Sequence, residues 1–224
     1  MTSKEAHTLV DIYRPQVNFS LHLDHGENAT LIQECVSAGY DSVHVDLKLE
    51  PPDELIEKVR LLTIYCHSHN VAVEAGIGEI SGSSTLIQKG KNRNIITDPD
   101  YAYYFATKTG IDFLLVSIGE TNGMSDRESL DFPLLTKIHQ KIPLPLVLHG
   151  GSGIAPDDLK KAINLGVRKI NFNTELRLAW ANGLKDAFTK NPSEIVPYRI
   201  LPYAHRAVQK VVDGKIKICT LALS

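Results

Sequence analysis

The segment Phe19-Ser-Leu-His-Leu-Asp-His-Gly26 ends an apolar, strand-like run in histidine, and Leu144-Pro-Leu-Val-Leu-His-Gly-Gly-Ser-Gly153 repeats that arrangement later in the chain. Short, continuous apolar runs are typical of parallel strands that are buried on both faces. In enzymes built on parallel (β/α) barrels, the catalytic groups lie at the C-terminal ends of the strands. The two segments therefore predict an enzyme of this kind, with histidines from different strands meeting at one mouth.

Strand and helix patterns alternate along the whole chain. Strands are predicted at residues 17–24, 42–46, 71–77, 113–118, 144–148 and 169–172. Helices are predicted at residues 28–39, 52–70, 97–110 and 154–166 and from residue 174 onward, from their capping residues, prolines and closing glycines. This alternation predicts an α/β fold with a parallel sheet. A closed barrel needs eight strands and typically about 250 residues, so either two βα units are missing or the sheet is open.

Composition narrows the class of protein. The 224 residues suit one domain, and 24 basic against 26 acidic residues give no broad charge for binding nucleic acid or an anionic membrane. Cys35, Cys66 and Cys219 are odd in number and widely spaced, which speaks against a disulfide framework. The sequence shows no secretory signal and no apolar run long enough to span a membrane. We expect a soluble, cytoplasmic protein.

The chain resembles a known family, the class II, zinc-dependent ketose-bisphosphate aldolases, which include fructose- and tagatose-bisphosphate aldolases. The resemblance implies a TIM-type (β/α) barrel that lacks the first two βα units, with residues 1–16 as a short leader and residues 17–224 as the matching part of one domain, 1–224. The segments that carry it occur in family order: His22-Leu-Asp-His25, Gly39-Tyr-Asp-Ser-Val-His-Val-Asp46, Val73-Glu-Ala75, Thr97-Asp-Pro99, Thr109-Gly-Ile-Asp112, Pro145-Leu-Val-Leu-His-Gly-Gly-Ser-Gly153 and Lys169-Ile-Asn-Phe-Asn-Thr-Glu175.

The resemblance implies a lyase of carbohydrate metabolism, of the glycolytic type, that splits a phosphorylated ketose into dihydroxyacetone phosphate and an aldehyde. By resemblance, Asp24 is the acid/base, and His25 and His149 are ligands of a Zn²⁺ cofactor. Zinc that is held by neutral imidazoles and open to substrate supplies the electrophile that aldol cleavage needs. The implied partner is a phosphorylated sugar.

A second group of residues resembles the family's phosphate site. Gly-Gly-Ser-Gly after a strand and before a helix can offer backbone N–H groups to an oxyanion, with a serine hydroxyl as a further donor. The next predicted strand closes on a polar segment whose threonine starts a helix. The predicted phosphate-binding residues are Gly123, Gly150, Gly151, Ser152, Asn171, Asn173 and Thr174.

Three features depart from the family pattern. Asn122 stands where the family has its third histidine ligand, and a carboxamide is a much poorer zinc ligand than imidazole, so Glu120, water or another group would have to step in. Gly76 replaces the second glutamate of the family's pattern, which leaves Asp46 as a possible second metal site without its partner. Ser81-Gly-Ser-Ser84 takes the place of an acidic loop.

Two alternatives to an active aldolase therefore remain open. The first is a catalytically impaired sugar-phosphate-binding or oligomer-partner protein that keeps the phosphate site. The second is a gene-model fragment without its first segment. A barrel that lacks two strands leaves apolar, unpaired strand edges, which are an association liability. We accordingly expect a homo-oligomer.

Overall fold

The structure is a computed structural model that describes residues 5, 8, 9, 12, 18–47, 52–77, 82–87, 96–120, 122–124 and 130–221, with the side chains of 82–87 and 122–124 left out. The leader predicted for residues 1–16 lies almost wholly outside these ranges. The chain divides into two compact units. The first comprises Met1–Ile77, Asp98–Leu115 and Gln140–Pro145, and the second comprises Gly78–Thr97, Val116–His139 and Leu146–Ser224.

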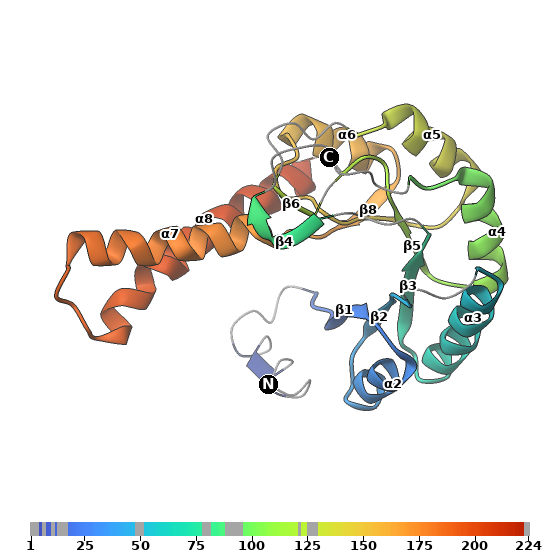
Figure 1. Cartoon of the computed structure of the whole chain (residues 1–224), viewed down its shortest axis with the longest axis horizontal. Coiled ribbons are helices and arrows are strands. Elements are labelled where there is room, and N and C mark those ends of the chain that lie inside the picture. Colours follow the sequence, from blue (N-terminus) through green and yellow to red (C-terminus); the bar gives the residue numbers. More distant parts are fainter. Residues whose placement is uncertain are drawn as a thin grey trace. The chain divides into compact units, whose positions relative to one another are not determined.

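The first unit is built on parallel strands. In order, β1 (His22–Gly26), β2 (Ser42–Val45), β3 (Ala72–Gly76) and β5 (Phe113–Val116) pair as neighbours, all parallel. Helices α2 (Ala29–Ser37), α3 (Pro52–Ser68) and α4 (Pro99–Thr109) connect them and lie along their outer side (Figure 1). Fully buried apolar side chains of these strands and helices make the core, among them Ile32, Val43, Val73, Phe105 and Leu114.

The helix signals of the first unit act as predicted. The side chain of Asn28 accepts a hydrogen bond from the Leu31 N–H at 2.9 Å and so begins α2. The side chain of Asp98 likewise accepts a hydrogen bond from the Tyr101 N–H and begins α4, where Pro99 occupies the first turn. Gly110 then ends α4 in the left-handed region, at φ 70°. A side chain is strained in that region and glycine is not.

The second unit holds the C-terminal elements. Strands β7 (Leu146–Leu148) and β8 (Val167–Ile170) pair in parallel, and β4 (Gly82–Ile87) pairs with β6 (Asn122–Met124) in a separate two-stranded sheet. Its helices are α5 (Phe132–Lys141), most of which lies in this unit, α6 (Pro156–Asn164), α7 (Thr174–Lys190) and α8 (Pro197–Leu221). The sequence patterns did not predict β4, β6 or α5.

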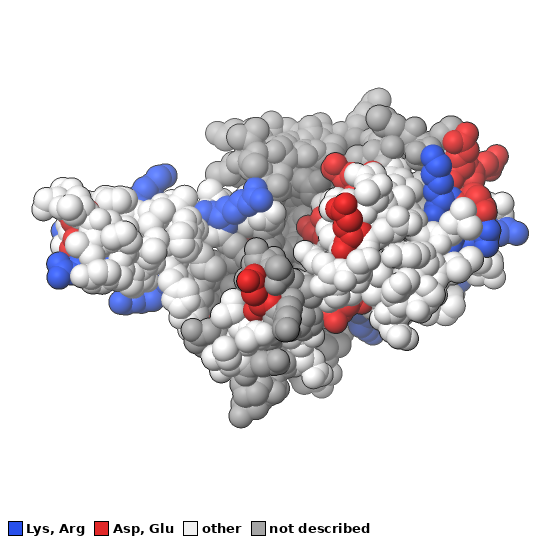
Figure 2. All heavy atoms as spheres, turned by 90° about the horizontal axis from the view of Figure 1, so that it is seen from below, with Lys and Arg blue, Asp and Glu red and all other residues white. Residues whose placement is uncertain are grey.

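Helices α7 and α8 lie side by side as a long pair (Figure 1). Gly183 of α7 allows their close approach, because a Cβ atom there would lie 2.6 Å from the Cα atom of Ala204 in α8. Charges of both signs are scattered over the face of the molecule shown in Figure 2, with Lys and Arg side chains on this helix pair. Among the described helices, none combines the length and the apolarity that crossing a lipid bilayer requires.

The parallel strands follow the order β1-β2-β3-β5-β7-β8. This confirms the predicted α/β class and the six predicted strands. The boundaries differ at both ends of the series, since β1 begins at His22 instead of residue 17 and β8 begins at Val167 instead of residue 169. Boundaries are the least certain part of a pattern-based assignment.

Candidate functional site

The end of β1 has an irregular backbone that sets the direction of its last side chains. His25 has φ 60°, in the left-handed region, and the pairing of β1 with β2 shifts register between Leu23 and Gly26. Gly26 is held tightly, because a Cβ atom would lie 2.8 Å from the carbonyl oxygen of His44. Bulges and left-handed non-glycine residues are frequent next to functional sites, where they re-aim a side chain.

His25 lies between two carboxylates. Its Nδ1 is 2.6 Å from Oδ2 of Asp46, and its Nε2 is 3.8 Å from Oδ1 of Asp24. In the neutral ring, a proton on Nδ1 would donate to Asp46 and leave the lone pair on Nε2. A carboxylate on the second nitrogen is the usual companion of a metal-binding histidine. The side chain of Asp24 is 52% exposed, so it is open to a substrate.

A buried carboxylate, Glu74 of β3, joins two further histidines. Its Oε2 lies 3.6 Å from Nε2 of His22, and its Oε1 lies 4.0 Å from Nδ1 of His44, which stands opposite it in the strand register. His22 also contacts the Ser42 hydroxyl through Nδ1 at 2.8 Å. A carboxylate that is 1% exposed is costly unless it is paired, so these histidines stabilise it in the core.

The sequence reasoning assigned no role to His44 or Glu74. The structure places the His44 ring 4.9 Å from the His25 ring, and one ligand atom from each of Asp24, His25 and His44 lies within 4.8 Å of the others. Two imidazoles and a carboxylate form a donor set that suits zinc. The one sequence feature that pointed to His44 was an ionisable residue inside an otherwise apolar strand. Such a histidine is more often hydrogen-bonded in the core than bound to a metal.

The remaining predicted metal residues belong to the second unit. His149 directly follows β7 and is 2% exposed. Glu120 is fully buried, and its Oε2 accepts the Ile118 N–H at 2.7 Å, so the carboxylate helps to shape its own loop. Asn122 and Gly123 lie in β6, whose side chains fall outside the described part of the chain.

The predicted phosphate site is assembled within the second unit. The hydroxyl oxygen of Ser152, whose side chain is buried, accepts the N–H groups of Asn173 and Glu175 at 3.3 Å each. Thr174 begins α7, as predicted, and is also buried. The N-terminus of a helix carries partial positive charge and attracts anions. Ser152 thus connects the glycine-rich loop to the first turn of α7.

Two amides of the glycine-rich loop already have partners inside the protein. The Gly151 N–H donates to the carbonyl of Asn171 at 3.0 Å, and the Gly153 N–H donates to Oε1 of Glu175 at 2.8 Å. Gly151 also leaves no room for a side chain, because a Cβ atom would lie 2.5 Å from Cγ2 of Ile170. The N–H groups of Gly150 and Ser152 are therefore the better candidates for contacting a phosphate.

Sequence reasoning did not single out Glu175 and Lys215. Lys215, from α8, donates to the same Glu175 oxygen at 2.8 Å, and its ammonium lies 4.8 Å from the centre of the Phe172 ring. Both charged side chains are mostly buried, at 15% and 19% exposure. The residues are 40 positions apart, and no local pattern connects them.

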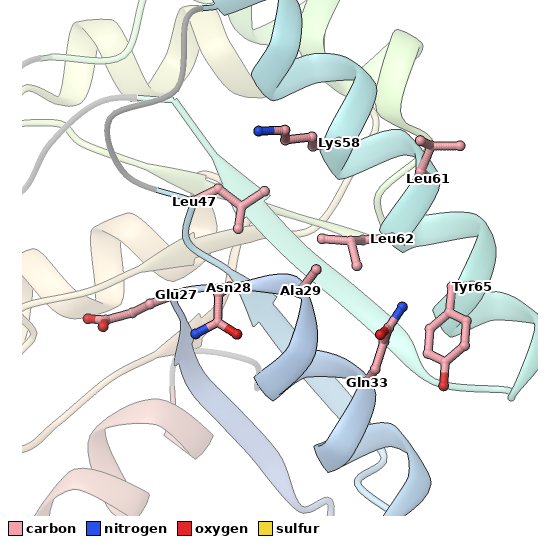
Figure 3. Close-up of a pocket in the computed structure, with 9 residues that line it drawn as sticks. All are labelled: Glu27, Asn28, Ala29, Gln33, Leu47, Lys58, Leu61, Leu62 and Tyr65. Atoms are coloured by element: carbon pink, nitrogen blue, oxygen red, sulfur yellow. The ribbon is translucent and has the colours of Figure 1, made fainter.

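A pocket of about 390 Å³ lies between α2 and α3 in the first unit (Figure 3). Its lining is mainly apolar, and the Asn28 side chain there already caps α2. No histidine lines it, and Glu27 supplies its single carboxylate. Its lining residues are Glu27, Asn28, Ala29, Gln33, Leu47, Lys58, Leu61, Leu62 and Tyr65.

The chain matches a family model, described as fructose-bisphosphate aldolase class-II, over residues 1–222. Among solved structures, it is similar to the YdjI aldolase from Escherichia coli K12, with 29% identity and a TM-score of 0.79, over 96% of this chain and 74% of that one. It is also similar to a Coccidioides immitis protein assigned as a fructose-1,6-bisphosphate aldolase, with 26% identity and a TM-score of 0.80, over 97% and 77% of the two chains. The fold is shared with fructose-bisphosphate aldolase from Campylobacter jejuni, at 20% identity and a TM-score of 0.78, over 97% and 74%.

Proposed function

Because this chain belongs to the class II fructose-bisphosphate aldolase family, we propose that it is a lyase that cleaves a phosphorylated ketose reversibly into dihydroxyacetone phosphate and an aldehyde. The ketose is of the fructose- or tagatose-bisphosphate type. The observation that carries the proposal is the arrangement at the end of β1, where Asp24 lies beside a histidine that Asp46 orients.

The proposed cofactor is zinc, with His25 and His149 as ligands. The residues present fit the ion, since His25 keeps Nε2 as a donor while Nδ1 contacts Asp46 at 2.6 Å. The assignment of His149 is supported by family membership and by its place directly after β7. When bound, zinc supplies a Lewis acid for the carbonyl oxygen of the ketose.

Asp24 is the proposed acid/base. In the cleavage direction, its carboxylate accepts the proton of the hydroxyl on the carbon that becomes the aldehyde, and in the synthesis direction it returns that proton. Its exposure of 52% and its place at a strand end suit a group that must reach substrate. The Nε2 atom of His25 lies 3.8 Å from this carboxylate.

The proposed phosphate contacts are backbone and hydroxyl donors of the second unit. Ser152 fixes the glycine-rich loop against the first turn of α7 through the Asn173 and Glu175 amides. A phosphate that binds there meets the positive end of the helix and the loop N–H groups. The further proposed contacts are Gly123, Gly150, Asn171, Asn173 and Thr174. The sequence also predicted Gly151, but its N–H already donates to the Asn171 carbonyl at 3.0 Å, so it shapes the loop instead.

A second candidate function is sugar-phosphate binding without cleavage. It is favoured by Asn122 at the usual third histidine and by Gly76, which sits against β5 so closely that a Cβ atom would lie 2.3 Å from the Leu115 carbonyl oxygen. The strand contact leaves no space at position 76 for a metal-binding carboxylate beside Asp46. The phosphate site does not depend on either position.

An assay of aldol cleavage tests both functions. Zinc-loaded protein is incubated with fructose 1,6-bisphosphate or tagatose 1,6-bisphosphate, and dihydroxyacetone phosphate is measured. Aldolase function predicts its release by the wild-type protein and loss of release in Asp24→Asn, which removes the base and keeps the shape. Binding of the sugar phosphate without release would support the second function, and absence of both binding and release would contradict both.

A further inference from the structure

The buried histidine of β2 lies where a metal ligand would be useful. His44 is 2% exposed, follows Val43 in a strand of the core, and has its ring centre 4.9 Å from that of His25, with the ring planes at 58°. One ligand atom of His44 lies within 4.8 Å of one from His25 and one from Asp24. Ligands of a tetrahedral zinc are about 3.3 Å apart for bonds of 2.0–2.1 Å. The 4.8 Å limit of the cluster lies above this spacing, so the side chains have to move closer together when an ion binds.

In both His25 and His44, a carboxylate faces the Nδ1 atom of the ring. Asp46 contacts Nδ1 of His25 at 2.6 Å, and Glu74 faces Nδ1 of His44 at 4.0 Å. The second distance is longer than a hydrogen bond, so Glu74 faces the His44 ring without bonding to it in this structure. Histidines that bind metals commonly donate their other N–H to a carboxylate, which fixes the tautomer and raises the basicity of the ligating nitrogen. In His25, a proton on Nδ1 directs Nε2 to the metal, and a proton on Nδ1 of His44, facing Glu74, would do the same there.

We propose that His44 is a zinc ligand of this protein and supplies the imidazole that the family pattern loses at Asn122. The inference rests on the proposed zinc-dependent function. It would add the imidazole of His44 to that of His25, both in the first unit, with a position left for substrate. Asp24, the most exposed of the three clustered residues, then stays available as acid/base.

Two variants separate ligation from support of the core. In His44→Asn, the amide nitrogen takes the place of Nδ1 and still faces Glu74, while the Nε2 position is lost. The matched control is His22→Gln, whose amide nitrogen takes the place of the Nε2 that lies 3.6 Å from the other oxygen of Glu74. Both variants keep a donor to the buried carboxylate, and only His44→Asn removes a proposed ligand.

The first measurement is zinc affinity by chelator competition, with metal content determined by mass spectrometry. We expect His44→Asn to lower the affinity by more than the about 10–100-fold of a change outside the ligand set, and His22→Gln to lower it less. Equal affinities of His44→Asn and the wild-type protein, at matched thermal stability, would overturn the inference. An equal loss in both variants would overturn it as well, since it would assign the effect to the Glu74 network.

A second measurement uses the wild-type protein and so does not depend on how the variants fold. Long-range ¹H–¹⁵N spectra of the histidine rings are recorded while zinc is added. We expect the Nε2 resonance of His44 to shift with zinc, and an unchanged His44 resonance would contradict the inference. Zinc bound through His44 without aldol cleavage would reject the proposed function alone, whereas cleavage with unchanged affinity in His44→Asn would reject this inference alone.

Discussion

Lys215 reaches Glu175 from α8, and its Nζ lies 2.8 Å from the Oε1 atom that also accepts the Gly153 N–H. The Lys215 ammonium thereby fixes the Glu175 carboxylate, which in turn accepts a hydrogen bond from the glycine-rich loop. The same glutamate donates its own N–H to the Ser152 hydroxyl oxygen at 3.3 Å. The C-terminal helix is therefore connected to the proposed phosphate site through one side chain.

The first prediction concerns this ion pair. Lys215→Met should destabilise the protein by about 1–3 kcal/mol, because it leaves the mostly buried Glu175 without its charged donor. It should also reduce the rise in melting temperature that inorganic phosphate produces. Both effects are measured by thermal unfolding with and without phosphate. Lys160→Met is the control, since Lys160 pairs with the well exposed Asp157 at 3.1 Å, and its stability should stay unchanged.

The second prediction concerns packing in the glycine-rich loop. Gly151→Ala should destabilise the protein by about 1–3 kcal/mol, because its methyl group would lie 2.5 Å from Cγ2 of Ile170 and 2.9 Å from Cε1 of Phe172. Gly214→Ala is the matched control. A methyl group at position 214 in α8 would have nothing within 4 Å of it, and alanine favours helix by about 0.5–1 kcal/mol. Chemical denaturation measures both, and equal effects of the same sign would refute the packing argument.

The third prediction concerns the phosphate ligand itself. A sugar phosphate or inorganic phosphate should raise the melting temperature of the wild-type protein, because it binds the folded state preferentially. Ser152→Asp should abolish that rise by placing a like charge at the buried position between the loop and α7. If the variant keeps the full rise, the ligand binds elsewhere in the protein.

The fourth prediction concerns zinc and position 122. In the His44→Asn variant, Asn122→His should raise zinc affinity markedly, because imidazole is a far better zinc ligand than carboxamide. Chelator competition measures the change. Asn191→His is the control, since it adds a histidine to an exposed position after α7 and should have no effect. An unchanged affinity of the double variant relative to His44→Asn alone would contradict the prediction.

The fifth prediction concerns pH. Burial raises the pKa of the Cys66 thiol from 9.0 to about 11, with the Asp112 carboxylate adding to the shift. The unfolded chain then loses the thiol proton at lower pH than the folded protein. This contribution to stability is therefore complete below pH 9 and is lost as the pH rises to about 11. At about 1.36 kcal/mol for each unit, the loss is about 2–3 kcal/mol.

Denaturation between pH 8 and pH 11 measures this loss. Cys66→Ala has no thiol to ionise, so its stability should fall less steeply over that range, even if it is lower at pH 8 because of the smaller side chain. Parallel curves for the two proteins would assign the alkaline loss to other groups.

Local signals explain which parts of the fold could be predicted. Asp98, Pro99 and Gly110 each act within one helical turn, so the sequence was enough to place α4. The pairing of β4 with β6 depends on residues about 40 positions apart and has no local signature. Patterns with period two or 3.6 report burial on one face and cannot report such partners.

The candidate site divides in the same way. Ser152 and Thr174 could be predicted because helix starts and glycine-rich loops follow local rules, and the structure brings them together within one unit. His44 could not be assigned, because its relation to His25 and Glu74 arises only when three strands pair in register. The left-handed backbone of His25 is equally absent from any sequence pattern.

The contact between β3 and β5 at Gly76 also bears on how this sequence can change. With the Leu115 carbonyl oxygen 2.3 Å from the position of a Cβ atom, and the two strands paired in register at these residues, any side chain at position 76 must separate the strands. A carboxylate cannot be restored there by one substitution without first remodelling the sheet. The contact therefore blocks the return of a carboxylate to position 76 by a single substitution. Single substitutions that raise metal affinity are confined to other positions.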